Sequence, residues 1–476
     1  MIKRIPQLKT WAVLLCLSAS GRAGAVEVTV YNQNLGLVKE TRTFTFKAGM
    51  NDIEASDVAA QIDPTSVHFK SLTEPETVKV AEQNFEYDLI SQDKLLEKYL
   101  GKEIELERFL GPNGEKRETI KGILLSVSGG RVLKSNGKLL VNPPGNPILG
   151  ELPEGLRAKP ALLWKIFSKN AGRRDCEMSY LTSGLSWQSD YVLVANAADD
   201  RMDLNAWVTI NNNSGAAYKD AKLKLVAGDV HQAPRPAGRR FAEKAMMFAA
   251  PVAAPQFEEK PFFEYHLYTL SSPTTLRENE TKQIELASAA EVPLKKLYIY
   301  DASPNLWGEF NDYTRMDPSY GAEGQKKVAV TLEFKNSKKD NLGIPLPKGK
   351  VRVYKSDPDG SLEFIGEDSI DHTPKDEKVR VKMGDAFDVV GERKRTDFQT
   401  DGKKRWAMES FELRLRNHKD SPVSVTAVEH LYRWSGWKIT DASQKWTKKD
   451  AQTVEFEVPV DKDGESVVTY TVKYAW

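Results

Sequence analysis

The chain has 476 residues, a length that suggests about three domains, and its 68 lysine and arginine residues nearly balance its 67 aspartate and glutamate residues. A near-neutral chain without a basic run argues against nucleic-acid binding. Cys16 and Cys176 are its two cysteines. A chain that has lost Cys16 with a leader cannot form an internal disulfide, so apolar cores must hold the fold together.

Residues 1–25 have the composition of a secretory leader. They carry four basic residues and no acidic one, with an apolar run from Trp11 to Leu17 and Ala23-Gly24-Ala25 as a small-residue cleavage site. Neither this run nor any later one approaches the ~20 residues of a membrane helix. We therefore expect a protein of the periplasm or an outer surface, with no transmembrane helix once the leader is removed.

The first two regions after the leader differ in pattern. Alternating apolar and polar residues predict an N-terminal β segment over residues 26–82. In the region 83–150, Ser91 is placed to cap a short helix that ends at Gly101, and compact strands with Gly-rich turns follow. One short helix with four or five tight strands predicts a small SH3-like or Sm-like barrel that serves as a spacer or a partner contact.

The central β domain, residues 151–325, is organised around one strand. From Met202 to Ile210 every second residue is apolar and the residues between are mostly polar, so one face of the strand lies in a core. A turn over Asn211–Gly215 leads to a second alternating strand over 220–228. Residues 229–261 are rich in proline and alanine, which predicts a low-complexity linker between two strands of this same domain.

Residues 326–476 predict a C-terminal β-sandwich region. Its short strands alternate apolar and polar residues between turns rich in Gly, Asp and Pro, without a long helical period. The last strand, Val468–Trp476, ends on an aromatic residue as an outer-membrane strand does, but charged, irregular strands precede it, which favours a sandwich edge strand. The predicted fold class is mainly β, with antiparallel β-sandwich domains and a small SH3/Sm-like barrel inserted near the N-terminus.

Several segments, in order along the chain, resemble a family of exported bacterial proteins. The family is catalogued as a domain of unknown function and is similar to the mucoidy-inhibitor-like proteins. The resemblance covers about residues 155–476 and implies an envelope location, with no agreed activity and no catalytic residues. The segments that carry it are Tyr180–Gln188 with Asp190-Tyr191, Asn212–Gly215, Leu225–Gly228, Phe263–Leu270, Thr281–Ile284, Ile344–Tyr354, Phe364–Asp368 and His372–Pro374.

Two candidate nucleophiles have better structural explanations. The segment Gly184-Leu-Ser-Trp-Gln188 lacks the second glycine of a nucleophile elbow and lies between two strands, so a turn is favoured. Cys176 alternates with Met178 and Tyr180 on one side of a strand, and a buried cysteine usually behaves as a small apolar side chain. We predict no catalytic residue at either place.

The sequence predicts no metal ion or other cofactor. Its six histidines are scattered, with no pair at helical ligand spacing. Asp371 and His372 form the one close acid–imidazole pair, and a capped turn is favoured over a polar site there. The turns at 357–360 and 461–464 contain Asp and Gly but lack the ligand spacing of an EF-hand, which favours hairpins.

Aromatic residues are the remaining candidates for binding. Trp187, Tyr191 and Trp207 are the candidate ligand-binding residues, with Trp434 and Trp437 as further candidates. Interior packing is the commoner role of tryptophan, but Trp207 lies on the polar face of its strand, where an exposed aromatic platform would bind a ligand.

The leading functional hypothesis is an exported cell-envelope β-sandwich protein that binds or scaffolds and is not an enzyme. Its partner would be an envelope protein or a polysaccharide. The alternative is an envelope hydrolase whose site is assembled from distant residues, with Asp371 and His372 as the starting point. A deep pocket with a cluster of polar side chains would favour the hydrolase, and a flat aromatic patch would favour binding.

Overall fold

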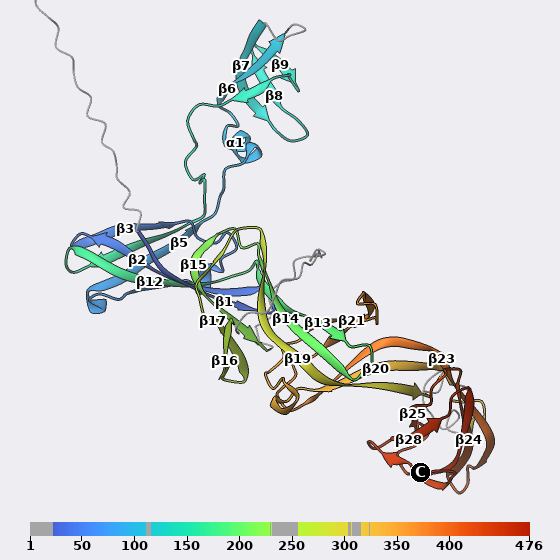
Figure 1. The fold of residues 1–476 in the computed structure, drawn as a ribbon. Coiled ribbons are helices and arrows are strands. Elements are labelled where there is room, and N and C mark those ends of the chain that lie inside the picture. Colours follow the sequence, from blue (N-terminus) through green and yellow to red (C-terminus); the bar gives the residue numbers. More distant parts are fainter. Residues whose placement is uncertain are drawn as a thin grey trace, which may run out of the picture. The chain divides into compact units, whose positions relative to one another are not determined.

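The structure is a computed structural model that describes residues 22–110, 116–228, 230, 256–302, 306, 316–322 and 324–476. The protein is mainly β, as the alternating pattern predicted (Figure 1). It divides into two compact units. Unit 1 comprises the described parts of Met1–Ser186, with Asn211–Val226 and Ser272–Thr281. Unit 2 comprises the described parts of Trp187–Ile210, Ala227–Ser271 and Lys282–Trp476.

Unit 1 contains two sheets that share a core. In the larger sheet the strand order is β15-β1-β2-β12-β4, and β1 pairs with β15 in parallel and with β2 antiparallel. The smaller sheet has the order β3-β11-β5. The strands are β1 (Arg22–Tyr31), β2 (Leu35–Phe46), β3 (Gly49–Ser56), β4 (His68–Ser71), β5 (Val78–Glu86), β11 (Ala161–Ser168), β12 (Gly172–Thr182), β15 (Tyr218–Ala227) and β18 (Thr274–Leu276). Short 3-10 turns lie at Pro64–Ser66 and Pro75–Thr77.

Aromatic packing joins the two sheets of unit 1. The Phe69 ring lies 6.1 Å from the Phe44 ring and 5.0 Å from the Trp164 ring, measured between centroids. Cys176 and Met178 alternate into the same core, as predicted, and are almost fully buried. Burial raises the pKa of the Cys176 thiol to about 11, so the thiolate needed for nucleophilic chemistry is scarce at neutral pH.

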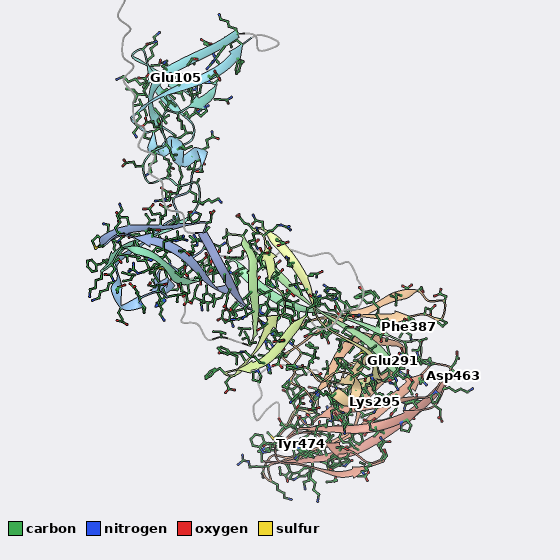
Figure 2. All side chains as sticks on the ribbon, turned by 60° about the vertical axis from the view of Figure 1, so that its left-hand side comes forward. Glu105, Glu291, Lys295, Phe387, Asp463 and Tyr474 are labelled. Atoms are coloured by element: carbon green, nitrogen blue, oxygen red, sulfur yellow. The ribbon has the colours of Figure 1, made fainter. Side chains whose placement is uncertain are left out.

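A small sheet in unit 1 has the strand order β10-β6-β7-β8-β9 (Figure 1). The strands are β6 (Glu103–Leu110), β7 (Lys116–Ser126), β8 (Val132–Ser135), β9 (Lys138–Val141) and β10 (Asn146–Ile148). Helix α1 (Gln92–Lys98) covers its apolar side, and the Ser91 Oγ accepts a bond from the Lys94 N–H at 3.2 Å, which confirms the predicted cap. Glu105 of β6, labelled in Figure 2, pairs with Lys121 of β7.

The small sheet does not close into the SH3/Sm-like barrel that the sequence suggested. Among the described residues, β9 and β10 each pair on one side only. These two strands have four and three residues, too short to coil around and meet. The result is an open sheet whose second face is exposed, with Leu139 and Val141 64 % and 72 % accessible.

Unit 2 is built on a long sheet with the order β22-β21-β13-β14-β19-β20-β23. These strands are β13 (Leu185–Ala195), β14 (Arg201–Asn212), β19 (Glu280–Asp301), β20 (Lys327–Lys335), β21 (Gly349–Ser356), β22 (Leu362–Ile370) and β23 (Lys378–Asp401). Strand β14 confirms the alternation predicted from Met202 to Ile210, because its apolar side chains are buried. One face of each strand therefore lies in the core and the other faces outward.

The C-terminal part of unit 2 is a sandwich. Strand β23 continues the sheet to β24 (Trp406–Asn417), β29 (Gly464–Ala475) and β26 (Trp437–Ala442). The second layer contains β25 (Val423–His430), β28 (Thr453–Val460) and β27 (Thr447–Lys448), and apolar side chains of both layers form one core. The last strand, β29, pairs on both sides, with β24 and β26. The expectation of an edge strand was therefore wrong. Strand β29 is a central strand, and alternate residues from Val468 to Tyr474 (labelled in Figure 2) point into the core of the sandwich.

Charged side chains are buried in this C-terminal core. Arg393 and Glu429 are 0 % exposed, and the Arg393 Nε lies 3.0 and 3.1 Å from the two Glu429 carboxylate oxygens. The Tyr470 hydroxyl donates to Glu429 at 2.7 Å, and the Arg393 guanidinium lies 3.8 Å from the centre of the Phe411 ring. Because both charges have lost their water, each depends on the other for its stability.

Buried asparagines tie three strand ends to distant loops. Asn212, Asn336 and Asn417 are 0 % exposed and lie at or just after the ends of β14, β20 and β24. Each carboxamide donates to one carbonyl in the loop that follows and to one carbonyl far along the chain. The acceptors are Ala216 and Arg277 for Asn212, Ile344 and Pro374 for Asn336, and Ser421 and Asp461 for Asn417. Asn212 and Ser214 of the Asn-rich turn predicted from the sequence are therefore buried, while Asn213 between them is exposed.

Two sequence expectations fall largely outside the described residues. Most of the expected leader precedes Arg22, where β1 begins, and most of the expected linker, 229–261, is not described. The described end of that linker is a strand: β16 (Phe257–Phe262) pairs antiparallel with β17 (Tyr265–Leu270). Strand structure therefore resumes before residue 261, earlier than the sequence suggested.

The buried ion pair gives a first prediction. Glu429→Ala should lower the free energy of unfolding by about 3–5 kcal/mol, because it leaves the Arg393 charge buried without a partner. Glu465→Ala, which removes an exposed partner of Arg414, should cost less than about 1 kcal/mol. Urea unfolding followed by circular dichroism compares the two variants, and equal losses would contradict this account of the core.

Candidate functional site

The hairpin of β13 and β14 positions the aromatic candidates. The Asn196 N–H bonds the Arg201 carbonyl at 2.9 Å, and the Asn213 N–H bonds the Gly184 carbonyl at 2.7 Å. One bond lies at each end of the hairpin, and both fit the same pairing register. In that register Asp190 on β13 lies opposite Trp207 on β14. Because neighbours along a strand point to opposite faces, Tyr191 lies on the other face from this pair.

Two of the three candidate binding residues face the core. Trp187 is 3 % exposed and Tyr191 is 0 % exposed. The Tyr191 hydroxyl donates to the Pro347 carbonyl at 2.6 Å, and the Trp187 ring lies edge-on to the Tyr268 ring at 6.4 Å. Both side chains are packed and offer no surface to a ligand, so the candidate site is built without them.

Trp207 lies on the outward face, as the sequence indicated. It is half-buried, between the two inward residues Ala206 and Val208. Its indole N–H donates to no residue within the described part of the chain. A half-exposed indole with an available donor can both stack against an apolar surface and donate a hydrogen bond.

Asp190 is the fixed polar group beside Trp207. It is 4 % exposed, and its Oδ2 accepts bonds from the Thr209 hydroxyl at 2.7 Å and the Gln188 amide at 3.3 Å. Its Oδ1 lies 3.4 Å from a guanidinium nitrogen of Arg352 on β21. Contacts to both oxygens hold this carboxylate in one orientation, so the polar surface next to Trp207 is preorganised.

Neighbouring strands extend the polar surface on both sides. On β19, the Gln283 amide donates to the Thr209 hydroxyl at 3.1 Å. On β21, Lys350 and Arg352 lie in register with Asp190 and Val192, and both approach Glu367 of β22, at 3.1 and 3.5 Å. We call the outward surface formed by Gln188, Asp190, Trp207, Thr209, Gln283 and Arg352 the Trp207 face.

The Trp207 face offers stacking and hydrogen bonding. It presents one half-buried indole, two carboxamides and one guanidinium on the outside of a sheet, around the almost fully buried Asp190 carboxylate. Such a set of donors and acceptors around an aromatic ring suits a flat ligand with many hydroxyl groups. Among the described residues, no group of three or more His, Cys, Asp or Glu could hold a metal ion.

The Asp371–His372 pair lies in an exposed turn after β22. The Asp371 carboxylate lies 3.3 Å from the Lys348 ammonium group, and the His372 Nδ1 accepts the Lys348 N–H at 3.1 Å. The Thr373 hydroxyl donates to the Asp371 carbonyl at 2.8 Å, which is typical of a turn. The pair thus bonds to Lys348, the residue that immediately precedes β21.

The nucleophile-like segment is mainly strand. Gly184, with a φ of +84°, forms the turn that precedes β13, and Ser186 lies within β13 itself. A Cβ on Gly184 would lie 2.6 Å from the Asn213 carbonyl oxygen, which explains the glycine. Ser186 therefore has a strand conformation, without the sharp strand-to-helix elbow of a serine nucleophile.

Sequence reasoning missed Asp190, Gln283 and Arg352 as partners of Trp207. Asp190 could have been found, because it alternates with the apolar residues Trp187, Tyr191 and Leu193 of its strand and must point outward. Gln283 and Arg352 belong to strands 76 and 145 positions beyond Trp207 in the numbering, and their proximity requires the strand order.

Comparisons with known proteins give one family. The family described as "Domain of unknown function (DUF4139)" matches residues 176–476, which include the whole Trp207 face. The search of curated proteins finds no match. No helix within the described part of the chain has the length and apolar character needed to cross a membrane.

The opposite orientations of two tryptophans give a second prediction. Trp187→Ala should lower the free energy of unfolding by about 3–5 kcal/mol, because it leaves a cavity in the core. Trp207→Ala should cost roughly 1 kcal/mol or less, because the side chain is already half-exposed. Urea unfolding by circular dichroism measures both, and a loss for Trp207→Ala as large as that for Trp187→Ala would place Trp207 in the core instead.

Proposed function

Since the chain belongs to the family described as a domain of unknown function (DUF4139), we propose a function from the Trp207 face: it binds a polysaccharide of the cell envelope. In this proposal the protein is exported, acts as a binding or scaffolding protein, and catalyses no reaction. The envelope location is supported by the leader-like residues 1–25 and by the resemblance to mucoidy-inhibitor-like proteins.

The observation that carries the proposal is a half-buried, outward-facing Trp207 beside a carboxylate that other side chains hold in place. A sugar ring has apolar faces of C–H groups and an edge of hydroxyl groups. The indole suits the apolar face, and Gln188, Gln283 and Arg352 suit the hydroxyl edge, with the buried Asp190 holding Gln188 and Arg352 in place. Because Asp190 and Thr209 are already ordered in the free protein, binding would lose little side-chain entropy there.

A flat sheet surface favours a long ligand over a small one. Small molecules are usually enclosed in clefts, whereas an extended polymer can lie across several strands. The residues of the Trp207 face come from four strands, β21, β13, β14 and β19, which are neighbours in that order. A polysaccharide crossing these strands would meet Arg352, Gln188, Trp207 and Gln283 in turn.

A hydrolase is the second candidate because a second carboxylate lies near. Glu285 is 8 % exposed and points to the same side of β19 as Gln283. Strands lie about 4.8 Å apart, so Asp190 and Glu285 have backbones about 10 Å apart. Inverting glycosidases hold their two carboxyl groups about 6.5–9.5 Å apart. Binding is favoured because both Asp190 oxygens already contact side chains of this chain.

Polysaccharide binding gives a third prediction. The purified protein should bind the soluble polysaccharide fraction of a bacterial envelope, and Trp207→Ala should weaken binding by about tenfold or more. The melting temperature should stay nearly unchanged. Asp371→Ala with His372→Ala is the control and should bind like the unmodified protein, because neither residue belongs to the Trp207 face.

Isothermal titration measures the affinity, and a reducing-end assay on the same mixtures tests for cleavage. Release of new reducing ends that Asp190→Asn or Glu285→Gln abolishes would establish the hydrolase and contradict the binding proposal. Undiminished binding by Trp207→Ala would contradict the proposal that the Trp207 face binds the polysaccharide.

Export gives a fourth prediction. Cells that make the full chain should yield a mature protein whose N-terminus lies at or near Val26, because Ala23-Gly24-Ala25 suits a leader peptidase. N-terminal sequencing of the envelope fraction checks this. A chain that keeps Met1 and stays in the cytoplasm would contradict the envelope location, although the Trp207 face could still bind sugars in vitro.

A further inference from the structure

A second outward surface of unit 2 is strongly basic. Six cationic side chains point outward from three neighbouring strands, β19, β20 and β23, while Leu332, Phe334 and Val381 point into the core. The cations are Lys295 on β19, Lys327 and Lys335 on β20, and Lys378, Arg380 and Lys382 on β23. All six are exposed, and we call this surface the basic face.

The register of the strands brings these charges together. Lys295 lies opposite Glu333, Glu333 lies opposite Arg380, and Lys335 lies opposite Lys378. Directly opposed side chains in a sheet have Cβ atoms about 4.5–5.5 Å apart. Of these opposed pairs, Lys335 and Lys378 have like charges and repel each other, so an anionic surface laid against this part of the basic face would stabilise it.

Few carboxylates neutralise the basic face. Glu333 is shielded beneath Lys378 and Arg380, which lie 3.0 and 2.8 Å from its two oxygens. Asp385 lies 2.9 Å from Lys327 and 3.6 Å from Lys382. Two carboxylates therefore form ion pairs with four of the six cations.

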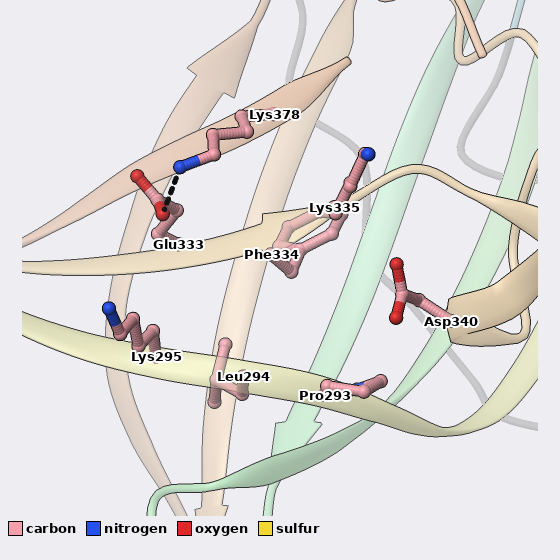
Figure 3. Close-up of a pocket in the computed structure, with 8 residues that line it drawn as sticks. All are labelled: Pro293, Leu294, Lys295, Glu333, Phe334, Lys335, Asp340 and Lys378. Atoms are coloured by element: carbon pink, nitrogen blue, oxygen red, sulfur yellow. Dashed lines mark hydrogen bonds and ion pairs between the residues drawn. The ribbon is translucent and has the colours of Figure 1, made fainter. Parts of the chain in front are cut away.

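The other two cations, Lys295 and Lys335, form no ion pair with any residue in the described ranges. They border a small hollow of about 190 Å³ between β19 and β20, shown in Figure 3 with Glu333, Lys378 and Asp340. Lys295, also labelled in Figure 2, lines a second, more polar hollow of about 610 Å³ with Lys296 and Lys419. In that second hollow Lys296 is paired with Asp199 and Lys419 with Asp388, so the cations of these hollows without an ion pair to a described residue are those that border the first hollow.

An exposed aromatic side chain lies at one end of the basic face. Phe387 is 95 % accessible and is labelled in Figure 2. The register of β23 with β20 shifts between Asp385 and Val390, so Phe387 lies in a bulge. Its neighbour Ala386 packs against the C-terminal core, so Phe387 points outward, on the same side as Asp385. The Phe387 ring is therefore free to enter an apolar or interfacial environment that is laid against this face.

We propose that the basic face seats unit 2 on an anionic lipid surface, with Phe387 entering the headgroup region. Clusters of four to eight Lys or Arg residues bind anionic bilayers, each cation strengthening the attraction about fivefold. Aromatic side chains favour the membrane–water interface. A soluble acidic polymer would neutralise the lysines but would leave Phe387 exposed to water. The presence of both a basic face and an exposed Phe387 therefore favours a lipid surface. This binding is independent of the Trp207 face.

Vesicle sedimentation tests the proposal with the full chain. The protein should bind vesicles of phosphatidylcholine that contain phosphatidylglycerol, should ignore phosphatidylcholine alone, and should detach as salt is raised. Lys295→Gln with Lys335→Gln and Lys382→Gln should weaken binding roughly a hundredfold. These three lysines are chosen because none of them contacts the shielded Glu333, so the core should be unaffected.

Two further variants make the test specific. Phe387→Ser should weaken binding about tenfold while leaving its salt dependence unchanged, because it removes an apolar contact and no charge. Lys47→Gln with Lys70→Gln and Lys138→Gln removes the same charge from exposed sites of unit 1 and should bind like the unmodified protein.

Three outcomes would overturn the proposal. One is the absence of binding to anionic vesicles. Another is an equal loss in the unit 1 control, which would indicate a general charge effect. The third is tight binding of a soluble acidic polysaccharide that displaces vesicles and is insensitive to Phe387→Ser, which would assign the basic face to an acidic polymer. Loss of sugar binding in Trp207→Ala with vesicle binding intact would leave both proposals standing separately.

Discussion

The two-residue period of the β-strand is the constraint on which the rest of this structure depends. In unit 2 one face of each strand is buried in the core, so only side chains on the opposite face can contact a ligand. Trp187 and Trp207, on paired strands, show the result: the first is buried and the second is half-exposed. A shift of one residue in either strand would exchange their surroundings, so the register that builds the core also selects the side chains that can meet a ligand.

The interior reinforces that register with polar groups. Apolar side chains tolerate small shifts, whereas a buried ion pair or carboxamide is stable only when its partners are in place. Arg393 with Glu429 fixes β23 against β25, and Asn417 ties the end of β24 to the loop before β29. Asn212 and Asn336 do the same at two other strand ends. These contacts hold the outward faces in a single arrangement, which a preorganised binding surface requires.

Much of this fold could be predicted from the sequence, because alternation is local. The strand from Met202 to Ile210, the helix cap at Ser91 and the inward position of Cys176 depend on residues that are close in the chain. The central position of β29 could not be predicted, because it depends on pairing with β26 as well as β24. The open form of the small sheet likewise depends on how short strands meet in space.

The candidate site, like the fold, could be predicted from the sequence only in part. The outward position of Trp207 can be predicted from the alternation within its own strand. The contacts of Arg352 with Asp190 and of Gln283 with Thr209 depend on which strands are neighbours in the sheet. The basic face has the same origin, since its six cations come from strands that lie far apart in sequence and are unremarkable within each strand. Near-neutral overall composition concealed a local excess of positive charge, because composition carries no information about which residues share a face.

Hydrogen–deuterium exchange with and without the envelope polysaccharide fraction tests the central claim most directly, namely that the outer face of the unit 2 sheet is the binding surface. The account predicts slower exchange in peptides that cover 188–192, 205–209 and 281–285, with little change in β29 or in the small sheet of unit 1. Protection confined to the small sheet or to the turn at Asp371 and His372, with exchange around Trp207 unchanged, would contradict it.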